Sequence, residues 1–308
     1  MRRNLLLDYL VYLAVRLFIC VVQATRIETG REMARWLAWL AGDVFKLRGA
    51  VVDENLCHAF PELPEKERRQ LTRQMWEHLF LLVLEVAHVP RKIHETNWRK
   101  FVKLQGVDQL VRVLLIDRPI IIVTGHFGNF EVGGYMLGML GYPTHSVART
   151  LDNPFLNDFV SRFRGGTGQY LIPKNGGYDQ ILDVLGSRGT MAFLADQAAG
   201  PKGCWVDFFG RPASTYKAIA LLALDHDAPV AVCYARRMDR PMSFEMVVNG
   251  IIDPREQDAE VDGIRDLTQW YTERLEAGIR QNPEQYWWVH RRWKDNRRRR
   301  RNQPKKAA

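Results

Sequence analysis

A histidine and a glutamate stand five positions apart in the segment Pro119–Glu131, PIIIVTGHFGNFE. A carboxylate bonded to one imidazole nitrogen fixes the tautomer and raises the basicity of the other nitrogen, which can then take a proton from a hydroxyl group. On an unbroken helix His126 and Glu131 would point roughly 140° apart, and in a strand they would face opposite sides. They can cooperate only if the chain turns between them, which Gly125 and Gly128 allow.

The elements around this pair fit a reactive site, and they also fit a purely structural role. The apolar run Ile120–Thr124 predicts a buried strand, and Glu131–Leu140 predicts a helix. A strand that passes through Gly-His-Phe-Gly-Asn into a helix presents a side chain beside a helix N-terminus. The same spacing also fits a histidine that caps a helix and a glutamate in its first turn, so spacing alone leaves both alternatives open.

From about residue 97 the pattern alternates between helices and strands, which predicts an α/β fold with a mainly parallel or mixed sheet flanked by helices. The expected strands are Ile120–Thr124, Thr144–Arg149, Tyr170–Pro173, Thr190–Ala195, Val230–Ala235 and Phe244–Asn249. The expected helices are Asp108–Leu115, Glu131–Leu140, Pro154–Arg164, Tyr178–Ser187, Ser214–Asp225 and Asp262–Gln281. Sites in such folds gather at the carboxyl ends of strands, where His126, Arg149 and Asp196 are expected.

Composition limits the class of protein and the kind of partner. The 308 residues are enough for one or two domains, and 46% hydrophobic and 26% charged residues are ordinary for a globular protein. A formal net charge of +9 favours an anionic partner, which is a phospholipid, a nucleic acid or an acidic carrier protein. The four cysteines are scattered, without paired metal spacing, which predicts reduced thiols and a cytosolic main body.

The N-terminal segment Leu5–Ala24 is almost continuously apolar and is about as long as a bilayer core requires, roughly 20 residues. A membrane anchor is the first interpretation. An interfacial helix is the second interpretation, because the central Arg16 is costly in a bilayer. A cleaved signal peptide is the third, since Val22–Ala24 resembles a weak cleavage site although Arg16 interrupts the apolar run. The basic residues that follow the segment place the body in the cytoplasm by the positive-inside rule.

These features divide the chain into four expected regions. Residues 1–26 form a membrane anchor helix, 27–96 a helical membrane-proximal region, 97–294 an α/β domain and 295–308 a basic tail. Within the second region we expect a helix over Thr29–Leu47, a turn-rich link over Glu54–Leu63, one helix from Pro64 to about residue 74 and another to about residue 88.

Three segments of the α/β region carry further candidate chemistry. Arg164 precedes the glycine cluster 165–168, which fits a phosphate cradle less well than a helix end followed by a turn. The segment Phe208–Gly210 could line an acyl groove or be packed in the interior. The tryptophans of 287–293 stand among basic residues, which suits a lipid headgroup interface or stacking on single-stranded nucleic acid.

Together these motifs resemble the lipid A late acyltransferases, the lauroyl and myristoyl transferases, within the glycerolipid acyltransferase group that has a His–four residues–Asp/Glu motif. The resemblance covers nearly the whole chain. Its motifs are Asn55–Leu56, Phe60–Glu62, Gly125–Glu131, Asn153–Pro154, Arg164 with Gly168, Asp196–Gln197, Phe208–Gly210 and Trp287–Lys294.

The resemblance implies an O-acyltransferase that moves a fatty acyl chain from an acyl carrier protein or coenzyme A thioester to a hydroxyl group of a lipid A precursor. It assigns His126 as the general base and Glu131 as its partner, and it implies functional roles for Arg164 and Asp196. A thioester is already activated, so we expect no metal and no cofactor. We expect backbone N–H groups near Gly128 and Asn129 to face the oxyanion.

The expected partners are the acyl donor, a phosphorylated glycolipid acceptor and an anionic membrane, without nucleic acid. Arg164, and also Arg149, are candidates to bind acceptor phosphates. The implied location is the inner membrane, with the catalytic domain on the cytoplasmic face. Rival interpretations are acyl transfer to another glycolipid, a hydrolase, which the lack of a Gly-x-Ser-x-Gly motif disfavours, and a basic membrane scaffold.

Overall fold

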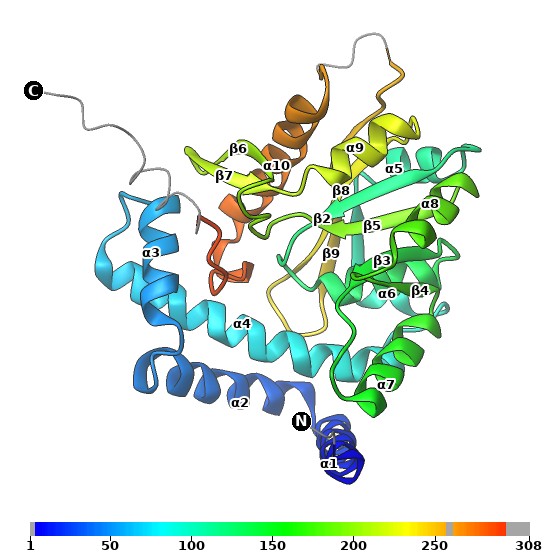
Figure 1. Cartoon of the computed structure of the whole chain (residues 1–308). Helices are drawn as coiled ribbons and strands as arrows, with labels where there is room; N and C mark the ends of the chain where they lie inside the picture. Colours follow the sequence, from blue (N-terminus) through cyan, green and yellow to red (C-terminus); the bar gives the residue numbers. More distant parts are fainter. Residues whose placement is uncertain (1–3, 257–260, 294–308) are drawn as a thin grey trace, which may run out of the picture.

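The computed structural model describes residues 4–256 and 261–293, and the predicted basic tail at 295–308 lies outside the described residues. The N-terminal region is helical, as expected. Its helices are α1 (Leu5–Ala24), α2 (Ile27–Trp39, extended by a π-helical turn at Leu40–Val44), α3 (Gly49–Ala59) and α4 (Glu65–Lys92). Figure 1 shows α4 running below the sheet and α2 running below α4.

Two boundaries in this region differ from the sequence-based expectation. Most of the expected link Glu54–Leu63 is the second half of α3, and the two expected helices after Pro64 are one helix of 28 residues. A buried stripe that recurs every three or four residues explains the unbroken α4, because one face packs against the body along its whole length. That stripe includes Leu71, Met75, His78, Leu81, Leu82 and Glu85.

The α/β fold class is confirmed by a seven-stranded mixed sheet in the order β1-β9-β8-β2-β5-β3-β4. Strands β8 and β9 are antiparallel, and the other neighbouring strands are parallel. The strands are β1 (Val102–Gln105), β2 (Ile120–Thr124), β3 (Thr144–Ala148), β4 (Gln169–Pro173), β5 (Thr190–Leu194), β8 (Val230–Arg237) and β9 (Phe244–Ile252). All six strands expected from the sequence are present.

Three strands were not expected from the sequence. The edge strand β1 has four residues, of which only Val102 is buried, so no alternating pattern marks it. The hairpin of β6 (Cys204–Phe208) and β7 (Arg211–Thr215) forms a separate two-stranded sheet. Because Ser214 belongs to β7, the helix expected to begin there begins four residues later, at Ala218.

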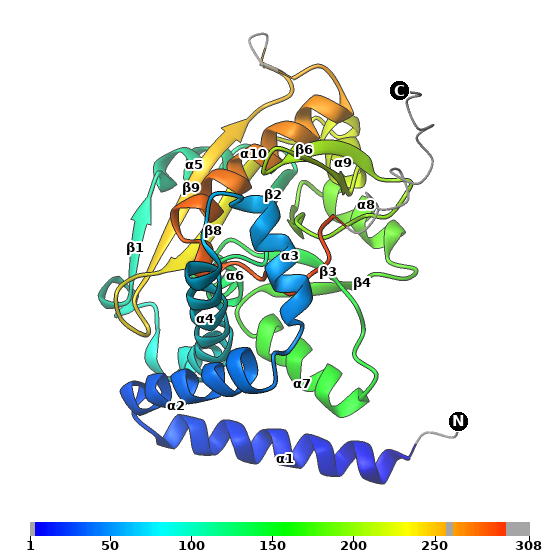
Figure 2. The ribbon, with the colours of Figure 1, turned by 90° about the vertical axis from the view of Figure 1, so that its left-hand side faces the viewer.

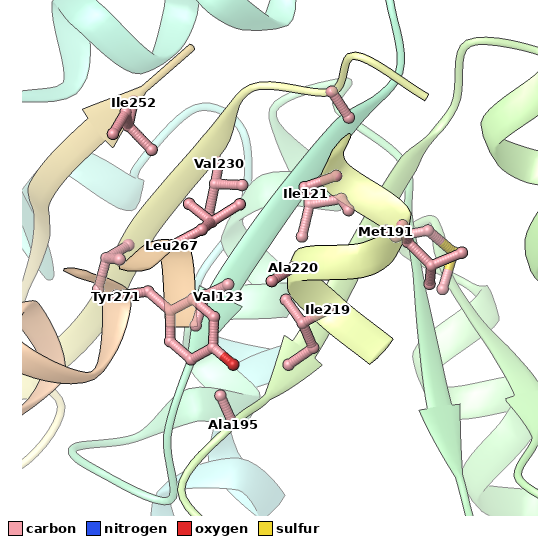
Figure 3. Close-up of a cluster of buried hydrophobic side chains, with 14 of the residues drawn as sticks. Ile121, Val123, Met191, Ala195, Ile219, Ala220, Val230, Ile252, Leu267 and Tyr271 are labelled. Atoms are coloured by element: carbon pink, nitrogen blue, oxygen red, sulfur yellow. The ribbon is translucent and has the colours of Figure 1, made fainter. Parts of the chain in front are cut away.

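Helices cover both faces of the sheet: α5 (Val107–Leu114), α6 (Phe130–Met139), α7 (Pro154–Gly165), α8 (Tyr178–Gly186), α9 (Ala218–Asp225) and α10 (Ile264–Gln281). Alternate residues of β2 point to opposite faces. Ile121 and Val123 pack with α8, α9 and α10, as Figure 3 shows for part of this cluster, whereas Ile120 and Ile122 pack with α5 and α6. The central strand is therefore buried on both faces. Its carboxyl end continues into the loop that carries His126.

The C-terminal segment after α10 returns to the sheet and packs against the β6–β7 hairpin and α3. Phe208, Phe209, Trp288 and Trp293 are buried together there. Of the two alternatives for Phe208–Gly210, interior packing is confirmed and the acyl groove is excluded, because both phenylalanine rings fill an internal cluster. The pattern at 287–293 suited a headgroup interface or nucleic-acid stacking, but Trp288 and Trp293 can serve neither, since their rings are buried.

Helix α1 lies along the outside of the body. Figure 2 shows it crossing one end of the molecule beneath α2 and α7. Tyr9 and Tyr12 contact the ring of Phe155 on α7, and Gln23 donates a hydrogen bond to the carbonyl oxygen of Ala87 on α4 at 2.7 Å. Both ends of α1 are thus attached to the body.

Candidate active site

His126 and Asp196 meet because their strands are neighbours in the sheet. Strands β2 and β5 are parallel, and the register pairs Thr124 with Leu194. Two residues further along, His126 Nδ1 lies 2.8 Å from Asp196 Oδ1, and the His126 N–H donates to Asp196 Oδ2 at 2.9 Å. The Asp196 side chain is 1% exposed and the His126 side chain 15%. The carboxylate therefore fixes both the backbone and the ring of His126.

The sequence-based prediction that Glu131 orients His126 is wrong in this structure. Glu131 lies in the first turn of α6, and its carboxylate accepts hydrogen bonds from Arg164 Nη2 and, at 3.0 Å, from Arg164 Nε. The register of β2 and β5 places Asp196 next to the imidazole. The chain turns after Gly128, so Glu131 points toward α7. Glu131 instead holds the guanidinium of Arg164 in a two-point ion pair.

Aromatic rings enclose the His126 imidazole on several sides. The Trp287 ring centroid lies 5.0 Å from that of His126, the His290 centroid 5.0 Å and the Phe130 centroid 5.4 Å. The amide Nε2 of Gln197 lies 3.4 Å from His126 Nε2 and 3.5 Å from His290 Nε2. Because Nδ1 bonds Asp196, Nε2 is the nitrogen left to exchange a proton.

The electrostatics of the site keep Asp196 ionised. Burial raises the pKa of the Asp196 carboxyl, but the charge of His126 and the hydrogen bonds from its ring and its N–H outweigh burial, so the net pKa is lowered. Burial, with the nearby charge of His126, lowers the pKa of the His290 imidazole. The site thus favours a carboxylate beside His126 and a neutral ring at His290.

The backbone of the loop from His126 to Asn129 is bonded to neighbouring elements. The Gly128 N–H donates to the Gln285 carbonyl at 3.0 Å, and the Asn129 N–H donates to the Ala235 carbonyl at 2.7 Å. The expectation that these N–H groups face the oxyanion is therefore wrong, because both are already used to attach the loop. Gly128 has φ +61°, and an added Cβ would lie 2.1 Å from the Ala235 oxygen, so only glycine fits.

The next two N–H groups belong to the first turn of α6. Among the described residues, the structure records no hydrogen bond to the N–H of Phe130 or of Glu131, whereas the Val132 N–H donates to the Asn129 side chain. The first turn of a helix commonly has such unpaired donors, and its dipole favours negative charge. Within the described chain, these two donors therefore have no recorded partner at the helix end that follows the His126 loop.

A cavity of about 820 Å³ begins at this site. Its polar lining includes His126, Glu131, Arg164 and Gln197, and its apolar lining includes Leu110, Leu114, Ile122, Leu137, Ala192 and Met246. This volume lies in the range of cavities that hold small-molecule ligands, and such sites combine an apolar wall with a few polar groups.

The other candidate residues, Arg149 and Asn129, differ from these in exposure and in their contacts. Arg149 also lines the cavity, but its side chain is 80% exposed and pairs with Asp152 on the surface. Asn129 is fully buried and donates to Glu85, so its side chain stabilises the loop and does not enter the cavity. Within the described residues, no group of three or more His, Cys, Asp or Glu side chains could hold a metal ion.

Sequence reasoning missed His290 and Trp287 as parts of this site. Both come from the segment that was expected at a surface, and only the return of the C-terminal chain brings them to His126. The one available signal was the motif Trp287–Lys294, which carries a histidine among tryptophans. Asp196 was identified, but as a residue for the substrate and not as the partner of His126.

Comparisons with known proteins identify the family of the chain. The family model for bacterial lipid A biosynthesis acyltransferases matches residues 2–295. The chain is 24% identical over 258 residues to the lipid A biosynthesis palmitoleoyltransferase of Escherichia coli, covering 83% of this chain and 81% of the relative. It is 25% identical over 264 residues to the lauroyltransferase of the same organism, covering 84% and 83%.

Among solved structures, the chain is similar to the 1-acyl-sn-glycerophosphate acyltransferase of Thermotoga maritima. The TM-score is 0.40 at 11% identity, over 83% of this chain and 97% of that one.

Proposed function

The chain belongs to the bacterial lipid A biosynthesis acyltransferase family, and from this premise we propose how it transfers an acyl chain onto lipid A. The donor is a fatty acyl thioester, the acceptor is a hydroxyl group of a lipid A precursor, and His126 is the general base. One observation carries the proposal: the hydrogen bond between His126 Nδ1 and the buried Asp196, at the mouth of the apolar cavity.

The proton chemistry follows from this hydrogen bond. Asp196 accepts from Nδ1–H, so the lone pair of the ring is on Nε2, on the side away from the carboxylate and 3.4 Å from the Gln197 amide nitrogen. Nε2 takes the proton of the acceptor hydroxyl as its oxygen attacks the thioester carbonyl. The imidazolium that forms is stabilised by Asp196, which stays ionised because its pKa is lowered.

The tetrahedral intermediate then collapses. The new C–O bond is kept and the C–S bond breaks, while the imidazolium returns its proton to the leaving thiolate, so the thiol and the ester are the products. We assign the N–H groups of Phe130 and Glu131 as donors to the oxyanion, since both lie in the first turn of α6 beside His126. General-base catalysis of this kind contributes about 10²–10⁴-fold to the rate.

Arg164 is the group we assign to an acceptor phosphate. Its side chain is 23% exposed and lines the cavity, and Glu131 holds its guanidinium from one side. A planar guanidinium has five N–H donors, so the ion pair with Glu131 leaves other donors for an anion. Arg149, more exposed at the same rim, is a second candidate for this role.

The donor is assigned from the cavity and from the charge of the chain. The apolar wall between the sheet and α5 suits a fatty chain, and palmitoleoyl and lauroyl groups are named for the relatives. The formal net charge of +9 suits an acidic acyl carrier protein as the carrier of that chain. Coenzyme A is the alternative thioester carrier.

Membrane attachment is assigned to α1. This helix could cross a bilayer by length and composition, and only 6% of its apolar window is buried in the body, so most of its apolar surface is exposed. Its outward face has exposed leucines at positions 5, 6, 10, 13 and 17, whereas Asp8, Tyr12 and Gln23 are turned toward the body. Because contacts hold both ends of α1 against α7 and α4, we infer that it lies along the inner-membrane interface, with the body on the cytoplasmic face.

The function is tested by mass spectrometry of lipid A from bacteria with and without this chain. The proposal predicts that lipid A from cells that carry the chain gains the mass of one fatty acyl group. Substitution His126→Ala should abolish this gain. If lipid A is identical in both strains while another glycolipid gains the acyl group, the assignment of the acceptor is wrong.

A further inference from the structure

A buried polar cluster outside the cavity connects α4 to the loop that carries His126. Glu85, in α4, is fully buried, and the Arg237 side chain at the end of β8 is 9% exposed. Arg237 Nε donates to Glu85 Oε1 at 2.7 Å, and Arg237 Nη2 donates to Oε2 at 2.6 Å. This two-point ion pair fixes the guanidinium, whose third nitrogen is directed at another residue of α4.

That residue is His78, two turns before Glu85 on the same helix. Arg237 Nη1 lies 2.6 Å from His78 Nδ1, and His78 Nε2 lies 3.2 Å from the carbonyl oxygen of Gly128. Because a guanidinium can only donate, Nδ1 is the acceptor and the ring hydrogen is on Nε2. His78 therefore donates this hydrogen to Gly128. Burial and the charge of Arg237 lower the pKa of His78 well below its usual value, which keeps the ring neutral.

The cluster holds the next residue of the loop as well. Glu85 Oε2 accepts a hydrogen bond from Asn129 Nδ2 at 3.0 Å, and Asn129 Oδ1 accepts one from the Val132 N–H at 3.2 Å. Asn129 is the N-cap of α6. One buried ion pair thus controls both the carbonyl group of Gly128 and the cap of the helix that carries Glu131.

We propose that His78, Glu85 and Arg237 are positioning residues for acyl transfer, which hold the Gly128–Asn129 turn so that His126 and the first turn of α6 face the substrate. The inference rests on the proposed function of His126. In the described part of the chain, none of the three lines the large cavity. They act through the loop and do not touch the reacting atoms.

A purely stabilising role explains this cluster poorly. A buried ion pair must offset the desolvation of both charges, so it is a weak source of stability compared with apolar side chains of the same size. A network in which every member is hydrogen-bonded instead specifies one geometry. Here each bond to the loop fixes an atom next to the site, and small displacements of such groups are costly for catalysis, up to about 10²-fold.

The test compares His78→Asn with His78→Gln in the purified full-length chain, with a lauroyl thioester as donor and a lipid A precursor as acceptor. The amide of asparagine reaches the place of Nδ1 and can accept from Arg237. The amide of glutamine reaches the place of Nε2 and can donate to Gly128. We expect His78→Asn to lower kcat about tenfold or more with an unchanged donor KM, and His78→Gln to recover most of the loss.

His88→Asn is the matched control, because His88 is equally buried on the same helix and has no recorded hydrogen bond among the described residues. It should leave kcat at the wild-type value. Thermal melting of all three variants reports their folding. In the His126→Ala background, His78→Asn should cause a smaller further loss than in the wild type, because part of the effect of the turn acts through His126 and part through the first turn of α6.

Equal kcat for the asparagine and glutamine variants would overturn the proposal, as would a loss of kcat in His88→Asn as large as in His78→Asn. A fall in melting temperature with a wild-type kcat would show a structural role only. If either His78 variant does not fold, Glu85→Gln, which keeps the size of the side chain, is measured for the same loss of kcat. Wild-type turnover in His126→Ala would instead reject the proposed function itself.

Discussion

The substitution Asp196→Asn tests whether Asp196 or Glu131 is the carboxylate that supports the His126 imidazole in catalysis. The substitution keeps the size of the side chain but removes the charge that holds Nδ1–H and stabilises the imidazolium. Asp196 is nearly fully buried and its oxygens bond both the ring and the N–H of His126, at 2.8 Å and 2.9 Å. Solvent therefore cannot replace the lost charge.

The expected magnitude follows from this geometry. A hydrogen bond to a charged group contributes about 1.5–3 kcal/mol. If that contribution is made in the transition state, its loss lowers kcat roughly 10- to 150-fold, since about 1.4 kcal/mol corresponds to a factor of ten. The donor KM should stay near the wild-type value, because Asp196 does not line the cavity among the described residues.

The assay is initial-rate acyl transfer from a lauroyl thioester to a lipid A precursor, measured at several pH values. Glu131→Gln is the matched control, since Glu131 is the other carboxylate beside the site and bonds Arg164. We expect this control to raise the acceptor KM more than it lowers kcat. A wild-type kcat in Asp196→Asn together with a large fall in kcat in Glu131→Gln would refute the pairing of His126 with Asp196.

Three further predictions concern the acceptor, stability and the donor. Arg164→Ala should raise the acceptor KM more than it lowers kcat, while Arg162→Ala, on the same helix but exposed and paired with Asp158, should change neither; equal effects in steady-state kinetics would contradict the phosphate role. Burial lowers the pKa of His78 and of His290 below 6.5, so the unfolded chain binds protons that the folded chain does not, and stability should fall as pH drops below 6.5. For His78 the free energy of unfolding should fall by up to about 1.4 kcal/mol for each pH unit below 6.5. A urea midpoint that stays constant from about pH 7.5 to 5 would exclude this linkage. Transfer from acyl carrier protein should slow as salt is raised, and a rate independent of ionic strength would argue against electrostatic attraction of the donor.

Much of the fold could be predicted from the sequence, because the strands are short apolar runs between helical patterns. The runs at β2, β5 and β8 lie where they were expected, and the helices between them differ by a few residues at their ends. The hairpin β6–β7 and the edge strand β1 have no comparable pattern. The unbroken α4 was missed because its buried stripe includes His78 and Glu85, which read as polar surface residues.

Four members of the site were predictable from the sequence, but their pairing was not, and neither were His290 and Trp287. His126, Glu131, Arg164 and Asp196 all lie at the cavity or against it. Which carboxylate meets His126 depends on β5 being the neighbour of β2, and Asp196 is 70 residues away in sequence. Strand order is not encoded in local pattern, so the pairing of His126 with Glu131 rested on the resemblance to the family motif. His290 depends on a still more distant return of the chain.

The attachment of α1 has a direct experimental readout. An N-terminal reporter that is active only in the cytoplasm should be active if α1 lies along the interface, because neither end of the helix then crosses the bilayer. A reporter that is active only in the periplasm should be silent in the same fusion. If the cytoplasmic reporter is silent and the periplasmic reporter is active, α1 spans the membrane, and its contacts with α7 and α4 are not kept there.

The most direct test of the role of His126 is the turnover number of purified His126→Ala with a lauroyl thioester and a lipid A precursor, beside a thermal melt of the same sample. With His126 as general base, kcat falls by about 10²–10⁴-fold while the melting temperature stays close to that of the wild type. A folded His126→Ala chain that transfers the acyl group at the wild-type rate would contradict this role.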